Sequence, residues 1–212
     1  MQMQFDFDNV CVKTYPPPEI KRKEILRYAG VSGDAPELDG VINECVAESA
    51  GLLVYKICYR IVYVSSNGDE LDFGLFKTSS SDLLKNLSGC GAAIIFAATV
   101  GTGIDRLIAK YNRLLPSKGL MMQSFGNERV ESLCDAFNSE ITEQMKSNGY
   151  STRPRFSPGY GDLTLNLQKD IFAVLDCPRK IGLMLNESLL MSPSKSVTAI
   201  IGITNDKSGV KK

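Results

Sequence analysis

The longest apolar stretch of the sequence constrains the fold more than any other feature. It covers residues 91–100 and consists almost entirely of small and branched apolar side chains. A membrane-spanning helix needs about 20 apolar residues, so this stretch is far too short to be one. A short apolar run rich in isoleucine and alanine is typical of a buried strand. We therefore expect the other elements to pack around a central strand.

The order of those elements predicts an α+β domain. Strands and helices are interspersed without the regular rhythm of a parallel sheet, which favours a mostly antiparallel sheet flanked by helices. We expect one domain over residues 1–212, with an N-terminal arm and short helix in 1–30 and a disordered tail in 205–212. Helices are predicted over 19–28, 34–49, 79–87, 104–115, from 117 onward and over 165–175, and strands up to 13 and over 53–64, 70–76, 92–100, 183–191 and 197–204.

Capping signals predict where two of the helices begin. Asp34 precedes Pro36 and Glu37, a pattern in which the aspartate caps the helix and the proline occupies its first turn. Ser117 is expected to cap the helix that follows residue 115.

The segment after Gly126 has the pattern of an amphipathic helix. We expect its apolar face to pack into the core and its charged face to lie opposite. The apolar face comprises Val130, Leu133, Cys134, Phe137, Ile141 and Met145, and the charged face comprises Glu131, Asp135, Glu140, Glu143 and Lys146.

The chain contains no histidine, and this excludes several kinds of site. A Ser-His-Asp triad, a histidine metal site and a histidine general base are all impossible. A cobalamin-binding module of the D-x-H-x-x-G type also requires a histidine as the lower cobalt ligand. The six cysteines are scattered without a C-x-x-C spacing and are expected to be buried apolar residues. We therefore expect neither catalytic residues nor metal ligands in this chain.

The charge balance argues against nucleic acid or an anionic membrane as a partner. The 24 basic residues equal the 24 acidic ones, so no net charge attracts a polyanion. The N-terminal segment MQMQFDFDNV lacks the basic and apolar regions of a signal peptide. We expect a cytoplasmic protein.

A glycine motif follows the central strand. Residues 100–105 read VGTGID, where glycines let a backbone approach a phosphate or an adenosine. The match is incomplete, because a dinucleotide fingerprint needs glycine in place of Arg106 and a methyltransferase loop needs glycine in place of Asp105. A tight turn is the favoured interpretation, and a Rossmann-type methyltransferase is the alternative.

A second motif, RPRFSPGYGD, covers residues 153–162. Arg155 offers a planar guanidinium that suits a carboxylate. Two prolines stiffen the loop, and Gly159 allows close approach of a ligand. Tyr160 adds an aromatic face and a hydroxyl. An ordinary loop and a site for an amino-acid carboxylate beside an adenine or ribose are both consistent with these residues.

A third motif, LNESLLMSPSKSVTAIIG, covers residues 185–202. Glu187 precedes a predicted strand in an apolar setting, and Lys195 lies in a loop of small residues that ends at Ser196. The segment is interpreted either as a hairpin, with Glu187 bonded to backbone amides, or as part of a binding site.

The second and third motifs, in this order, resemble the activation domain of cobalamin-dependent methionine synthase. The segments ATVGTGIDRLIAKY and PSKGLMMQSFGNERVESLCDAF are similar to stand-alone forms of that family. The family's signature for S-adenosylmethionine is R-x-x-x-G-Y. The resemblance implies a twisted, mostly antiparallel sheet with flanking helices and a cofactor site at Arg155, Phe156, Ser157, Gly159, Tyr160, Glu131, Glu187, Lys195 and Ser196.

The resemblance also implies a role in methionine biosynthesis, namely reactivation of methionine synthase by reductive methylation. The chain would present S-adenosylmethionine to cob(II)alamin carried by a partner, a methionine synthase chain without its own activation domain. A flavodoxin or ferredoxin would supply the electron. The homocysteine, folate and cobalamin modules are missing, so the chain is not expected to make methionine alone. Ile200 and Ile201 replace family aromatics, so the adenosine pocket is expected to differ. A non-enzymatic adaptor that docks on a corrinoid protein is the remaining alternative.

Overall fold

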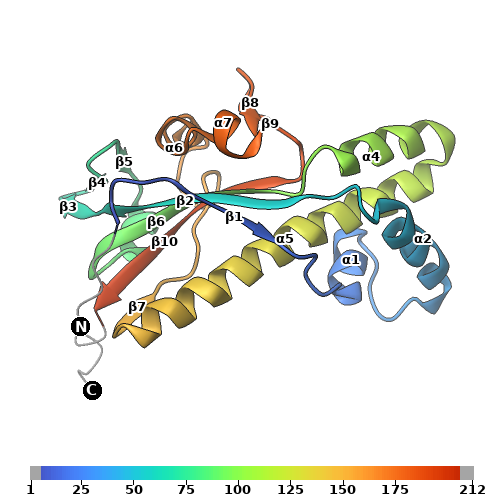
Figure 1. Ribbon diagram of the computed structural model, residues 1–212, viewed down its shortest axis with the longest axis horizontal. Coiled ribbons are helices and arrows are strands. Elements are labelled where there is room, and N and C mark those ends of the chain that lie inside the picture. The colour runs from blue at the N-terminus through green and yellow to red at the C-terminus, as the bar shows by residue number, and fades with distance from the viewer. Residues whose placement is uncertain (1–5, 206–212) are drawn as a thin grey trace.

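The apolar run forms the central strand of a five-stranded sheet. In the computed structural model, which describes residues 6–205, this strand is β6 (Cys90–Thr99), and the order across the sheet is β1–β2–β6–β10–β7 (Figure 1). Residues 92–99 are buried on both faces of the sheet, as predicted. The other strands are β1 (Cys11–Tyr15), β2 (Tyr55–Tyr63), β7 (Tyr150–Thr152) and β10 (Ser196–Asn205).

Every neighbouring pair of strands in this sheet is antiparallel. The α+β prediction is therefore confirmed. The Rossmann-type methyltransferase alternative is wrong, because it requires a parallel sheet. The N-terminal segment contributes the edge strand β1, whereas β10 reaches Asn205, where a tail had been predicted to begin. The rest of that predicted tail lies outside the described residues.

Helices cover the two faces of the sheet and form two hydrophobic cores (Figure 1). The side chains of β6 alternate between them, with Ile94 and Phe96 in the first core and Ala93 and Ile95 in the second. The first core lies under α1 (Arg22–Tyr28), α2 (Asp39–Ser49), α4 (Gly103–Leu114) and α5 (Pro116–Ser147), and the second lies under α3 (Ser81–Asn86), α6 (Leu167–Leu175) and α7 (Cys177–Ile181).

The helix α5 is a single element of 32 residues. Its predicted apolar face is confirmed, because all six side chains of that face are buried. The predicted cap at Ser117 is wrong: Leu115 occupies the N-cap position and Pro116 the first turn. Gly119 and Gly126 lie inside the helix, where α4 and Lys195 respectively pack too closely for a side chain.

Several short elements differ from the predictions. The segment 70–76 does not pair with 53–64; it contributes β4 (Glu70–Asp72), which lies between β3 (Ser65–Asn67) and β5 (Lys77–Ser79) in a separate sheet. The predicted strand 183–191 is instead a hairpin of β8 (Met184–Leu185) and β9 (Met191–Ser192). Asp34 pairs with Arg22 instead of capping, and the helix begins with a 3-10 turn, η1 (Pro36–Leu38).

The glycine motif after β6 is a packed turn. A Cβ atom on Gly103 would lie 2.2 Å from the carbonyl oxygen of Leu52, and Gly101 has φ +79°. The carboxylate of Asp105 accepts a hydrogen bond from the backbone N–H of Ser194 at 3.2 Å, which ties α4 to the segment before β10. The motif therefore joins β6 to α4 through close backbone contact.

Replacing Gly103 with alanine is expected to lower the free energy of unfolding by about 1–3 kcal/mol, because the new methyl group overlaps the backbone at Leu52. Urea denaturation measures this change. The matched control is Gly91→Ala, since a Cβ on Gly91 meets no atom within 4 Å. Equal stability of the two variants would contradict the packing argument.

Candidate functional site

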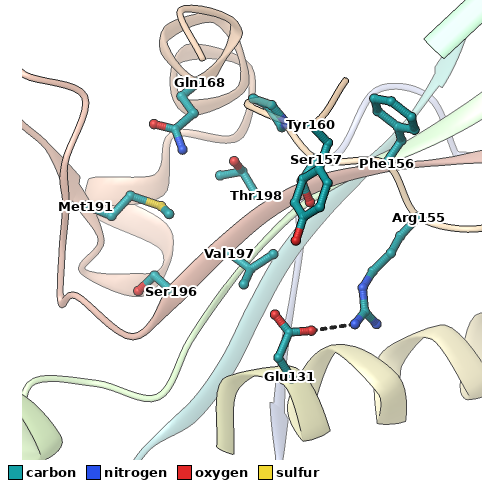
Figure 2. Close-up of a pocket in the computed structure, with 11 residues that line it drawn as sticks. Glu131, Arg155, Phe156, Ser157, Tyr160, Gln168, Met191, Ser196, Val197 and Thr198 are labelled. Carbon is teal, nitrogen blue, oxygen red and sulfur yellow. Dashed lines mark hydrogen bonds and ion pairs between the residues drawn. The ribbon is translucent and has the colours of Figure 1, made fainter. Parts of the chain in front are cut away.

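A pocket of about 390 Å³ lies along the outer edge of β10, opposite β6 (Figure 2). Its walls come from α5, from the loop after β7, from α6, from β9 and from the first residues of β10. The lining residues are Glu131, Arg155, Phe156, Ser157, Pro158, Tyr160, Gln168, Met191, Ser196, Val197 and Thr198.

The pocket exists because β10 is only partly paired on this edge. The strand β7 pairs with residues 203–205 alone. Further along, the loop makes one bridge, in which Phe156 and Ile200 exchange backbone hydrogen bonds of 2.8 and 2.9 Å. Peptide groups alternate along a strand, so those of Thr198 point to the same side as those of Ile200. The loop residue in register with Thr198 is Pro158, which has no N–H to donate. Pairing therefore ends, and the edge faces the pocket.

Arg155 forms one end of the pocket and is held by two carboxylates of α5. Its Nη2 lies 2.6 Å from Oε2 of Glu131, and its Nη1 lies 2.8 Å from Oδ1 of Asp135. The other oxygen of Asp135 accepts a hydrogen bond from Nζ of Lys21 at 2.7 Å. Burial opposes ionisation of Asp135, but the bonds from Lys21 and Arg155 outweigh it and hold its pKa below the usual value. The guanidinium is thus fixed in place before any ligand binds.

Glu131 presents a carboxylate to the pocket beside this guanidinium. Arg155 uses only Oε2, and Figure 2 shows the carboxylate at the pocket wall facing Val197. Glu131 had been assigned to the charged face of a helix, and it is the residue of that face that lines the pocket. A cationic and an anionic group consequently lie side by side at one end of the pocket.

The other end of the pocket is buried, polar and uncharged. Gln168 and Thr198 are only 5% and 2% exposed. Neither Oε1 of Gln168 nor Oγ1 of Thr198 has a hydrogen-bond partner among the described residues. The sequence motifs did not identify these two residues; their only signal was a polar side chain on an otherwise apolar helix face, for Gln168, and in an apolar strand, for Thr198.

The loop that carries Arg155 is fastened to the start of α3. The carboxylate of Asp162 accepts hydrogen bonds from the N–H and hydroxyl of Ser81, both at 2.7 Å, and from the hydroxyl of Ser80. Bonds from Ser80 and Ser81 hold the pKa of Asp162 well below its usual value. Gly159 and Gly161 have φ of +92° and +53°, so the turn between Arg155 and Asp162 needs glycine at these positions.

The structure brings most of the predicted site residues together. Arg155, Phe156, Ser157, Tyr160, Glu131 and Ser196 all line the pocket. Gly159 lies in the same turn, and Phe156 also packs against the second core. The hydroxyl of Ser196 donates to the carbonyl of Pro193 at 2.8 Å, so its hydrogen bond stays within the protein.

Two predicted site residues lie elsewhere. Lys195 is buried against α5, where its ammonium donates to Asn127 at 2.8 Å and Gln123 at 3.2 Å, and burial lowers its pKa. The aliphatic part of its side chain crosses Gly126, where a Cβ atom would lie 3.0 Å from Cγ of Lys195. Glu187 is exposed in the turn between β8 and β9, so the apolar setting expected for it is wrong.

Two kinds of site are not found in the described part of the chain. No cluster of three or more cysteine, aspartate or glutamate side chains among residues 6–205 could hold a metal ion. None of the helices described there is long and apolar enough to cross a membrane.

Known proteins resemble this chain in structure. No family model matches the sequence, and no curated protein matches it. A solved structure described as the MetH reactivation domain bound to AdoHcy matches with a TM-score of 0.70 and 15% sequence identity. The match covers 92% of this chain and 78% of that one. The chain has the fold of that reactivation domain. The resemblance inferred from the motifs is therefore confirmed at the level of fold.

Replacing Asp162 with alanine is expected to release the loop while leaving the cores intact, because the carboxylate supplies its hydrogen bonds to the start of α3. Amide hydrogen exchange in residues 153–162 should become roughly tenfold faster. The control Asp170→Ala, at an exposed position of α6, should not change it. Unchanged exchange in the Asp162 variant would show that other contacts hold the loop.

Proposed function

We propose that this protein binds S-adenosylmethionine in the β10 pocket and presents its methyl group to a corrinoid carried by a partner protein. The observation that carries the proposal is the paired Glu131 and Arg155 at one end of an otherwise mostly uncharged pocket. The structural neighbour, described as bound to AdoHcy, supports this choice of ligand.

The charged end suits the amino-acid portion of S-adenosylmethionine. A free α-amino acid carries an ammonium and a carboxylate on one carbon atom. The carboxylate of Glu131 is available to the ammonium, and the guanidinium of Arg155 still has N–H groups beyond those that bind Asp135 and Glu131. Neighbouring groups of opposite charge therefore match neighbouring charges on the ligand.

The size and walls of the pocket suit the rest of the ligand. Its volume of about 390 Å³ lies within the range of roughly 300–1,000 Å³ that is usual for small-molecule sites. Val197, Met191 and the ring of Tyr160 supply apolar contact between the two polar ends.

The proposed methyl transfer needs no acid or base from this chain. A sulfonium carries a good leaving group, a neutral thioether: the methyl carbon would bond to the cobalt while the carbon–sulfur bond broke and its electron pair stayed on sulfur, giving S-adenosylhomocysteine. The partner's corrinoid, reduced by one electron from a flavodoxin or ferredoxin, would supply the nucleophilic cobalt. The residues of this chain would contribute placement and exclusion of water. A chain without histidine can therefore take part.

The mouth of the pocket offers a surface for such a partner. Tyr160, which lines the pocket, is 70% exposed, and Leu190, next to the lining residue Met191, is 64% exposed; Leu165 packs against the turn at Gly159. Exposed apolar side chains around a ligand site are typical of a docking surface. Because the net charge is zero, docking would depend on local contact and not on long-range attraction.

Replacing Arg155 with alanine is expected to weaken binding of S-adenosylmethionine by about 1.5–3 kcal/mol, because a charge-assisted contact is lost. Isothermal titration calorimetry measures the change. The matched control is Arg153→Ala, two residues away, whose guanidinium donates to the carbonyl of Ser88 outside the pocket. Equal affinities for the Arg155 variant and the wild type would remove this residue from the site.

The complete reaction tests the partner. The assay combines this protein, a methionine synthase lacking its own activation domain in the cob(II)alamin state, a one-electron donor and methyl-labelled S-adenosylmethionine. Label is expected on cobalt only with all components present, and at least about tenfold more slowly with Arg155→Ala. Equal methylation without this protein would contradict the activation role. Binding of the partner without binding of S-adenosylmethionine would favour the adaptor alternative.

A further inference from the structure

We infer that Gln168 and Thr198 form a second recognition end of the pocket, which reads the hydrogen-bonding edge of the adenine ring. This inference rests on the proposed function and extends it. Both side chains line the pocket, one from α6 and one from β10, and both are more than nine-tenths buried. Figure 2 shows the amide of Gln168 and the hydroxyl of Thr198 on either side of a gap beside Met191, with the amide nitrogen nearer that gap than Oε1.

The unpartnered atoms at this end point to a ligand. Buried polar atoms in proteins nearly always have a hydrogen-bond partner, because leaving one unpaired is costly. Oε1 of Gln168 and Oγ1 of Thr198 have none among the described residues. Both side chains line the same end of the same pocket, so a ligand bound there is the candidate partner for each.

The chemistry of this end favours a nucleobase over a charged group. No charged side chain lines it; the lining charges are those of Glu131 and Arg155 at the other end. A carboxamide carries a donor and an acceptor side by side, which is the pattern that glutamine uses to read N6 and N7 of adenine. Met191 and Val197 provide apolar surface for the faces of a flat ring.

The location on β10 adds a backbone contribution. The N–H and C=O of Thr198 point toward the pocket side of the strand, where Pro158 ends the pairing. An aromatic ring with donors and acceptors in its plane can lie against such an edge. The position normally filled by a neighbouring strand would then be filled by the base.

Two isosteric variants test the inference, Gln168→Met and Thr198→Val, with S-adenosylhomocysteine as the probe. Each should bind the probe roughly 3–10-fold more weakly than the wild type, as expected for loss of a neutral hydrogen bond. The melting temperature of the ligand-free protein should stay the same or rise, because each change removes an unpaired buried polar atom. A merely structural role for either side chain predicts a lower melting temperature instead.

A matched control separates this effect from burial alone. Oδ1 of Asn138 is also buried without a partner, but it lies on α5 outside the pocket. Asn138→Leu should therefore leave affinity for the probe unchanged. The melting temperature of this ligand-free variant should also stay the same or rise.

A base analogue tests which edge is read. S-inosylhomocysteine carries an oxygen in place of the 6-amino group and should bind the wild type about tenfold more weakly than S-adenosylhomocysteine. Gln168→Met should abolish that preference. Wild-type affinity in both pocket variants, with binding lost in Arg155→Ala, would overturn this inference and leave the proposed function intact. Absence of binding in the wild type would overturn both.

Discussion

The incomplete pairing of β10 is the constraint on which the rest of the site depends. One edge of this strand is bonded to β6 along nearly its whole length, and the other is bonded to β7 only at its C-terminal end. An inner strand normally has hydrogen-bonded neighbours along both edges. The unpaired stretch of β10 therefore leaves space for the pocket between the strand and the loop after β7. The single bridge at Phe156 and the proline two residues later determine where that room begins.

The charged end of the pocket is built on helical spacing. Glu131 and Asp135 are four residues apart, so they project from the same side of α5 and can hold one guanidinium between them. Lys21 binds the far side of Asp135, so two acidic and two basic side chains are joined. The guanidinium is thereby held in a defined orientation, which lowers the ordering cost of binding an anion.

How much of this could be predicted from the sequence depended on whether the signal was local. The apolar run of β6 and the buried face of α5 follow from periodicity alone. The loop with Arg155 was found from its motif, and Glu131 was assigned to the same cofactor site only by resemblance; the ion pair between them was not predicted. Gln168 and Thr198 lie on different elements, and only the tertiary packing that places both in one pocket gives them a shared role. Lys195 was misplaced because a lysine in a loop gives no sign of the glycine, 69 residues earlier, that makes space for its stem.

The length of α5 has a consequence for the rigidity of the pocket. A helix of 32 residues is about 48 Å long, and Glu131 lies near its middle, far from ends that fray. Thr198 lies in a strand paired with β6, so two walls of the pocket belong to the parts of the molecule that open least often. A third wall is the loop after β7, which is held at its ends by β7 and Asp162 and in between by Arg155 and Phe156. The loop wall is thus tied to both rigid walls, to α5 through Arg155 and to β10 through Phe156, so the three walls hold one another at fixed spacing.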